Sequence, residues 1–163
     1  MKPALRLYRP GDRAACAHIF YRAVRQGASA FYNEAQRAAG APSDQPHPDL
    51  PDKLPDQWCW VAERPGRVVG FMSICRDGYL DMACVLPEEM GRGTASALCR
   101  NLLAKARCEQ LPRLTVLASH LARRFFSKLG RRVESTENLA KAGEVYEVFH
   151  MVLDEVNAVH PGV

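Results

Sequence analysis

The hydrophobic and polar positions of this chain repeat with two different periods, which separate short strands from amphipathic helices. Residues 5–9 alternate at every second position and predict a strand. Pro10 and Gly11 end this strand, and Asp12 is a suitable N-cap for a helix that extends to about Gly27. Three apolar runs joined by short turns then predict an antiparallel meander of strands at 58–62, 68–75 and 79–85.

The second half of the chain continues with helices and strands in alternation. Apolar residues at helical spacing predict a helix over about 95–106. The apolar run 114–118 predicts a strand parallel to 79–85, because a helix connects the two. Ser119 can cap a further helix that Gly130 ends. Two final strands are expected around the dipeptide Ala142-Gly143, near 131–137 and 145–153.

The segment between residues 29 and 57 differs from the rest. Residues 35–39 could continue a helix, but several prolines prevent regular structure beyond them: Pro42, Pro46, Pro48, Pro51 and Pro55. A connection of this length is either a binding loop or a surface excursion that covers the core. The aromatic residues near it either shape a substrate pocket or pack in the core: Phe31, Tyr32, Trp58 and Trp60.

Composition narrows the class of protein. A chain of 163 residues that is 47% hydrophobic and 25% charged predicts one globular domain over residues 1–163. The net charge of +4 is mild and dispersed, which favours a small anionic ligand over nucleic acid. No apolar run has the length of a signal peptide or a membrane span, and the six cysteines form no C-x-x-C pair, so we expect a cytoplasmic protein. The five histidines lack metal-ligand spacing, so no metal is expected.

The segment 85–95 carries the most informative chemistry, because it places a glycine-rich turn between an apolar strand and a helix. The first turn of a helix has unpaired N–H groups and the positive end of the helix dipole. Gly91 and Gly93 allow an anionic group to approach this backbone without meeting a Cβ atom. The helix that follows has no carboxylate before Glu109. The turn therefore suits a phosphate group.

Other interpretations of this turn are weaker or remain open. It lacks the Gly-Lys-Ser/Thr ending of a P-loop, and a Rossmann fingerprint would miss its third glycine. A helix that starts with a glycine turn and binds no ligand is the remaining alternative. Glu88 and Glu89 count slightly against an anion site, but they precede the turn, where their side chains can point to solvent.

The order of elements and two motifs together resemble the GNAT family of N-acetyltransferases. The motifs lie in residues 85–95 and 118–130. The family's pattern Gln/Arg-x-x-Gly-x-Gly/Ala corresponds to residues 90–95. This chain departs from the pattern at its first position, where it has Met90. The resemblance implies an α/β protein with the GNAT acyl-CoA N-acyltransferase fold. In that fold a mixed, mostly antiparallel sheet has a central pair of parallel strands that splay apart, and helices flank the sheet.

The same resemblance implies a site for acetyl-coenzyme A, used as a cosubstrate without a metal, between strands 79–85 and 114–118. The main chain of Ala83, Cys84 and Val85 would pair with the pantetheine arm, and an N–H of Val85 or its neighbour could donate to the thioester carbonyl. Ser119 and Phe125 are placed to line the cleft, although Ser119 is as well explained as a helix cap. The pyrophosphate would lie against the backbone of Met90, Gly91, Arg92, Gly93, Thr94 and Ala95.

Acetyl transfer needs an uncharged amine, and because a lysine-type amine has a pKa of about 10.4, a base must remove its proton. Asp81 is the first candidate, since it is a carboxylate in an otherwise apolar strand beside the expected cleft. Burial there would raise the pKa of its carboxyl group. The alternative is that Asp81 lies on the exposed face of an alternating strand. Glu63 and Glu144 are weaker candidates near strand ends.

The leaving group is a thiolate with a pKa of about 8.5, so an acid helps without being obligatory. Many members of the family place a tyrosine where this chain has Phe126. The usual acid therefore cannot be carried over, and Tyr146, Tyr79 or solvent would have to replace it.

Three classes of function follow from these observations. The first is an enzyme that transfers an acetyl group from acetyl-coenzyme A to a primary amine of a small molecule or peptide. The second is a non-catalytic domain that binds or senses acyl-coenzyme A, which the missing tyrosine allows. The third is an adaptor that uses surface arginines. We expect neither nucleic acid nor a membrane as partner. Dimers are common in the family, which leaves a homodimer open.

Overall fold

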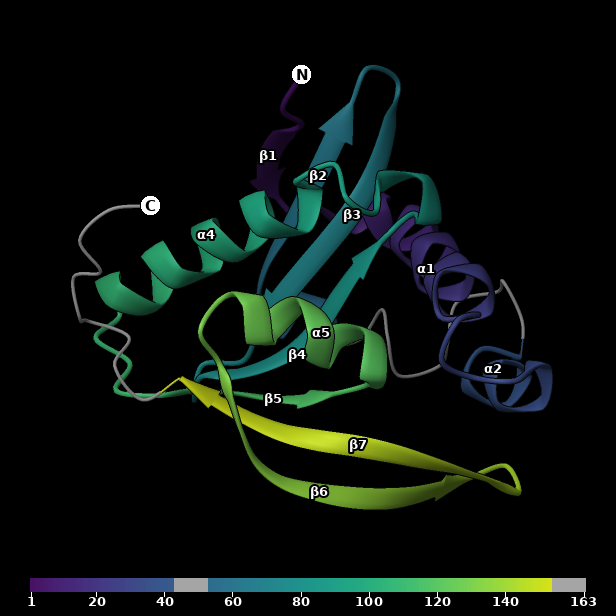
Figure 1. Cartoon of the computed structure of the whole chain (residues 1–163). Coiled ribbons are helices and arrows are strands. Elements are labelled where there is room, and N and C mark those ends of the chain that lie inside the picture. Colours follow the sequence, from purple (N-terminus) through teal and green to yellow (C-terminus); the bar gives the residue numbers. More distant parts are fainter. Residues whose placement is uncertain (43–52, 154–163) are drawn as a thin grey trace.

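The computed structural model describes residues 1–42 and 53–153, and its strands form a single sheet (Figure 1). The strand order across the seven-stranded sheet is β1-β2-β3-β4-β5-β7-β6. Only β4 and β5 are parallel neighbours among the described strands, and every other pair is antiparallel. The strands are Ala4–Leu7 (β1), Trp58–Arg64 (β2), Arg67–Ile74 (β3), Tyr79–Val85 (β4), Leu114–Ala118 (β5), Arg132–Lys141 (β6) and Glu144–Leu153 (β7).

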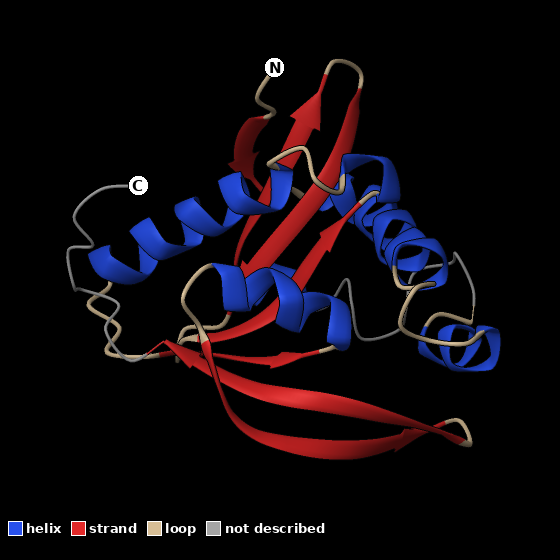
Figure 2. Cartoon of the chain, viewed as in Figure 1, coloured by secondary structure: helices blue, strands red, loops and turns tan. Residues whose placement is uncertain are grey.

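The helices occur in the predicted order along the chain (Figure 2). They are Arg13–Arg22 (α1), extended by a π-helical turn at Ala23–Gly27, Glu34–Gly40 (α2), Thr94–Cys108 (α4) and His120–Lys128 (α5). Short 3-10 turns lie at Pro10–Asp12, Leu54–Asp56 and Pro87–Glu89. The predicted fold is confirmed. No helix among the described residues is long and apolar enough to cross a membrane.

Helices α1 and α4 cover opposite faces of the sheet. The Nζ atom of Lys105 in α4 lies 5.0 Å from the centre of the Trp58 ring, so Trp58 faces α4. Cys59 therefore faces the other side, because successive side chains of a strand alternate. Cys59 is buried there with Cys16 and Ile19 of α1. The proline-rich residues 43–52, on which the binding-loop alternative depends, lie outside the described part of the chain.

Three local expectations need correction. Asp12 occupies the N-cap position of α1 as predicted, but its side chain makes no capping hydrogen bond, because its carboxylate accepts two hydrogen bonds of 2.8 Å from the Arg6 guanidinium, which lowers the pKa of Asp12. The first strand ends at Leu7, two residues before the predicted end at residue 9, because Pro10 already begins a 3-10 turn. Strand β6 extends to Lys141, beyond the predicted end near 137, because pairing with β7 continues to the turn at 142–143.

The parallel pair at the centre of the sheet is very short. Strands β4 and β5 have just two pairs in register among the described residues, Tyr79 with Thr115 and Leu80 with Val116. Figure 2 shows the two strands diverging from this point toward their C-terminal ends. The predicted splayed pair is therefore present, and the gap opens on the side where α4 and α5 begin.

A β-bulge marks the same point on β4. Met82 pairs with Ser73 and Leu80 pairs with Ile74, so Asp81 is an extra residue without a partner in the register with β3. A bulge bends its strand and increases the local twist. The bend therefore turns β4 away from β5 directly after Leu80.

Gly78 closes the narrow end of this gap, and we predict that a methyl group there is strongly destabilising. Its φ is +96°, and a Cβ atom would lie 2.3 Å from the carbonyl oxygen of Arg113. Gly78→Ala should lower the free energy of unfolding by about 3 kcal/mol, from backbone strain and steric overlap together. Gly66→Ala is the matched control, because Gly66 has a φ of +85° with no heavy atom within 4 Å of a Cβ position. It should cost about 1 kcal/mol in urea unfolding, and equal losses would contradict this prediction.

Candidate functional site

A cavity of about 590 Å³ occupies the gap between β4 and the two helices α4 and α5. The π-helical turn that extends α1 closes it on one side, through Ala23 and Gly27. Predicted cofactor residues that line it are Ala83, Cys84, Val85, Met90, Gly91, Gly93, Ala95 and Phe125. The structure thus brings residues 83–95 and Phe125 of α5 to one cavity, whereas the sequence connected them only through a family resemblance.

The glycine turn presents open main chain to this cavity. Gly91 and Gly93 have φ values of +77° and +83°, and no heavy atom lies within 4 Å of a Cβ position at either residue. Gly93 is the N-cap of α4, and its carbonyl accepts the first helical hydrogen bond from Ala97 at 3.0 Å. The N–H groups of the residues before Ala97 in the first turn have no intrahelical acceptor. These groups and the helix dipole make the turn a fitting cradle for a diphosphate.

Arg92 takes part in this turn in a different way from its neighbours. Its N–H donates to the carbonyl of Glu89 at 3.2 Å, so this amide stabilises the turn itself. The side chain of Arg92 is 52% exposed, and its guanidinium donates to the Glu89 carboxylate at 3.1 Å. What Arg92 can offer an anion is therefore its side-chain charge.

Glu89 does not point to solvent, which corrects the expectation for this residue. Its side chain is fully buried and accepts hydrogen bonds from Arg64 Nε at 2.9 Å and 3.0 Å and from Thr94 Oγ1 at 2.8 Å. The Arg64 contact is the main reason why the pKa of Glu89 is lowered. Nothing in the local pattern could reveal this, because Arg64 lies on β2, 25 positions earlier in the chain.

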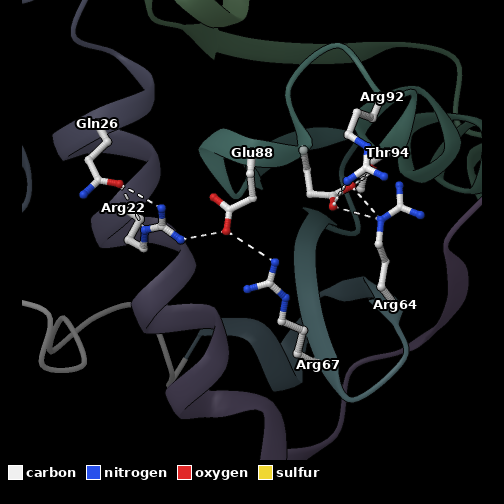
Figure 3. A network of polar contacts seen from close by, with 8 residues as sticks. Arg22, Gln26, Arg64, Arg67, Glu88, Arg92 and Thr94 are labelled. Carbon is white, nitrogen blue, oxygen red and sulfur yellow. Dashed lines mark hydrogen bonds and ion pairs between the residues drawn. The ribbon is translucent and has the colours of Figure 1, made fainter.

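Glu88 lies on the outer side of the same turn. Figure 3 shows its carboxylate between Arg22 of α1 and Arg67 of β3. Its Oε1 atom lies 2.9 Å from Nη1 of Arg22 and 3.4 Å from Nη2 of Arg67. The Glu88 side chain is 37% exposed. The hydrogen bond from Arg22 is the main reason why the pKa of Glu88 is lowered. The two adjacent glutamates are thus surrounded by arginines, and neither leaves an uncompensated negative charge beside the turn.

The free edge of β4 forms the wall of the cavity. Ala83, Cys84 and Val85 pair with β3 on one side, while the described register with β5 ends at Leu80. The N–H of Leu86 donates to Val69 of β3 at 2.9 Å, so by strand alternation the N–H of Val85 points away from β3. Burial raises the pKa of the Cys84 thiol to about 12, so this thiol stays protonated and unreactive near neutral pH.

Helix α5 forms the opposite wall. Ser119 caps this helix by accepting a hydrogen bond from the N–H of Ala122 at 3.2 Å, so the alternative of a helix cap is confirmed for it. Phe126, at the position of the family tyrosine, is fully buried and contacts Phe125 edge to face. Residues of the cavity lining that the sequence did not reveal include Met72, Ser96, Leu121, Arg124 and Lys128.

Asp81 lies at the point where β4 and β5 separate. It is half-buried and accepts a hydrogen bond of 2.8 Å from Gln57 Nε2. As the bulged residue, it departs from the regular alternation that the exposed-face alternative assumed. Asp81 is not one of the residues that line the cavity; on β4 the lining begins two residues later, at Ala83.

The other candidates for proton transfer lie elsewhere. The hydroxyl of Tyr146 donates to the carbonyl of Gln36 in α2, and its ring lies 5.8 Å from that of Tyr32. Glu63 binds Arg6 at 2.7 Å on the β1 side of the sheet. Glu144 pairs with Lys141 at the tip of the β6–β7 hairpin. Tyr79 is half-buried, which raises the pKa of its phenol.

The aromatic residues near the proline-rich segment do not form one pocket. Phe31 and Tyr32 contact the His120 ring at the start of α5, with ring centroids 6.2 Å and 5.8 Å away. Trp58 lies on the α4 face between Arg76 and Lys105, and Trp60 packs against the core. No cluster of histidine, cysteine and carboxylate side chains that could hold a metal occurs in residues 1–42 and 53–153.

Comparison with known proteins agrees with this geometry. A family described as acetyltransferase (GNAT) domain matches residues 26–153. The Escherichia coli (strain K12) protein named Uncharacterized N-acetyltransferase YafP is 36% identical over 147 residues, which cover 90% of this chain and 93% of YafP. A GCN5-related N-acetyltransferase from Rhodopseudomonas palustris superposes with a TM-score of 0.88 at 30% identity, over 94% of this chain and 96% of that chain.

A more distant structure shares the fold. The PaiA N-acetyltransferase from Thermoplasma acidophilum, solved in complex with coenzyme A, has a TM-score of 0.75 at 14% identity, over 94% of this chain and 99% of that chain. The family match extends over most of the chain and includes both walls of the cavity, β4 and α5. The chain therefore belongs to the GNAT family of acetyltransferases.

Proposed function

We propose that this enzyme transfers an acetyl group from acetyl-coenzyme A to a primary amine of a small molecule or peptide. The observation that carries this proposal is a cavity with the open glycine turn at one end and the free edge of β4 along one wall. This combination suits a long ligand with a diphosphate at one end and an amide-containing arm at the other. The complex of PaiA with coenzyme A supports the choice of ligand.

The residues present fit this ligand along its length. The amides of Gly91, Gly93, Thr94 and Ala95 would hold the diphosphate, and the guanidinium of Arg92 would add positive charge. The edge at 83–85 would pair with the pantetheine arm as a short additional strand. When bound, the donor supplies an acetyl group activated as a thioester. Phe125 covers the cleft from α5.

Two groups of the chain then act on the reaction. The N–H of Val85 points toward the gap and would stabilise negative charge on the carbonyl oxygen, an effect of about 3 kcal/mol in comparable sites. Asp81 would accept the proton of the incoming amine, because it is the carboxylate at the point where β4 separates from β5, two residues before the cavity lining begins on this strand.

The departing thiolate can be protonated by solvent, since its pKa of about 8.5 is close to neutral. An acid role for Tyr146 would require its hydroxyl to leave the carbonyl of Gln36. That contact favours a role of Tyr146 in holding α2 against β7. The expected homodimer and cytoplasmic location stay predictions.

A non-catalytic sensor of acyl-coenzyme A would have the same cavity but release no thiol. Phe126 in place of the family tyrosine is the observation that favours this second candidate. Steady release of free coenzyme A with any amine of a screened panel supports the enzyme. Binding without release across the panel supports the sensor.

The first prediction from this proposed function concerns the glycine turn. Gly93→Asp should abolish detectable coenzyme A binding in calorimetry, because it places a bulky negative group where the diphosphate would lie. Gly130→Asp is the control, because Gly130 has a similar φ of +81°, also has open space at its Cβ position, and follows the far end of α5. Affinity retained in Gly93→Asp, or lost equally in both variants, would contradict the assignment.

The second prediction concerns Asp81. Asp81→Asn should lower kcat about 100-fold near pH 7 and leave the dissociation constant of coenzyme A unchanged. The asparagine amide can still accept the hydrogen bond from Gln57, but it cannot take a proton from the amine. The loss should shrink at higher pH, where more of the amine is already neutral. Asp56→Asn, at an exposed position of the 3-10 turn before β2, is the control. An unchanged pH–rate profile would remove Asp81 from the reaction.

A further inference from the structure

The buried carboxylate of Glu89 has no part in the chemistry above, yet it lies directly beside the turn that would hold the diphosphate. We propose that Glu89 is a positioning residue, whose contacts with Thr94, Arg92 and Arg64 hold the turn 90–93 in the shape that presents its amides to a diphosphate. This inference rests on the proposed function. It adds that affinity for the phosphate-bearing part of the donor depends on a side chain the donor does not need to touch.

The contacts of Glu89 tie the two ends of the turn together. Glu89 ends the 3-10 turn before the glycines, and Thr94 is the first residue of α4 after them. The hydrogen bond of 2.8 Å from Thr94 Oγ1 to Glu89 Oε2 therefore spans the whole turn. Both side chains are buried, so water does not compete for this bond. The Arg92 N–H adds a second link by donating to the Glu89 carbonyl.

Arg64 attaches this closed turn to the sheet. Its Nε donates to both oxygens of the Glu89 carboxylate, at 2.9 Å and 3.0 Å, and another nitrogen donates to the carbonyl of Met1. The Glu89 carboxylate is thus fixed in position and direction by a residue of β2. Because Gly91 and Gly93 give the turn freedom, a fixed point of this kind determines which of its shapes is populated.

Simple electrostatics predicts the opposite effect for this residue. A carboxylate near a site for an anion opposes binding, so neutralising it should strengthen the attachment of a diphosphate. A positioning role predicts weaker attachment, because the turn loses its anchor. The two explanations differ in sign, so one substitution decides between them.

The experiment compares Glu89→Gln with Glu88→Gln, which removes the same charge one residue away at an exposed side chain. Calorimetry with coenzyme A should show about tenfold weaker binding for Glu89→Gln, since a hydrogen bond to a charged group is lost, and a change within about twofold for Glu88→Gln. Thr94→Val, which keeps the shape and removes the donor to Glu89, should weaken binding in the same direction. Thr94→Ser, which keeps a hydroxyl, should restore it.

A donor without phosphate separates positioning from general damage. With S-acetylpantetheine, Glu89→Gln should keep kcat/KM within about twofold of the wild type, while kcat/KM for acetyl-coenzyme A falls about tenfold. Hydrogen exchange in the absence of ligand should become faster at the amides of residues 91–95 and stay unchanged in β3.

Each other outcome overturns the inference. Coenzyme A binding to Glu89→Gln that equals or exceeds the wild type would mean that charge, and not position, is what Glu89 contributes. Equal losses for both donors would assign Glu89 to overall stability. If Glu89→Gln fails to fold, unchanged binding in Thr94→Val overturns the proposal on its own. A wild-type protein that does not bind coenzyme A refutes the proposed function first, which distinguishes the two failures.

Discussion

The separation of β4 from β5 after two residue pairs is the constraint on which the site depends. A strand edge inside a protein leaves N–H and C=O groups without partners, and such groups need a ligand or water. The bulge at Asp81 and the tight contact of Gly78 with Arg113 fix where the separation begins. The cleft is therefore a consequence of backbone geometry, and the side chains around it mainly decide what fills it.

The two ends of the gap between β4 and β5 present different chemical groups. At the wide end, the glycine turn and the start of α4 concentrate main-chain donors with the positive end of a helix dipole. At the narrow end, the half-buried Asp81 lies where the main-chain pairing stops. A ligand that reaches both ends is held by main-chain groups along most of its length, so side chains such as Glu89 act on its attachment mainly by fixing the shape of that main chain.

Local signals in the sequence were sufficient for the fold and for half of the site. Period-two and helical patterns, the turn at 77–78 and the glycines at 91 and 93 act over a few residues, and the elements they predict are present. The errors arise where distant residues decide. Arg6 binds the Asp12 carboxylate that would otherwise make the capping hydrogen bond of α1, and Arg64 holds the Glu89 side chain in the interior. From the sequence around it, a glutamate is expected on the surface, and its burial can be predicted only when its partner in space is known.

The pairing of Glu89 with Arg64 has a consequence for how this sequence can change over generations. Replacing Glu89 alone leaves Arg64 without its carboxylate, and replacing Arg64 alone leaves the buried Glu89 carboxylate with the half-exposed Arg92 as its remaining charged partner. Descendants of this protein should therefore keep both residues or lose both, although the two positions lie on different elements. Thr94 should vary with them, because its hydroxyl would lose its acceptor. Correlated substitution at these three positions would identify the lineage in which an acidic residue came to position the turn 90–93.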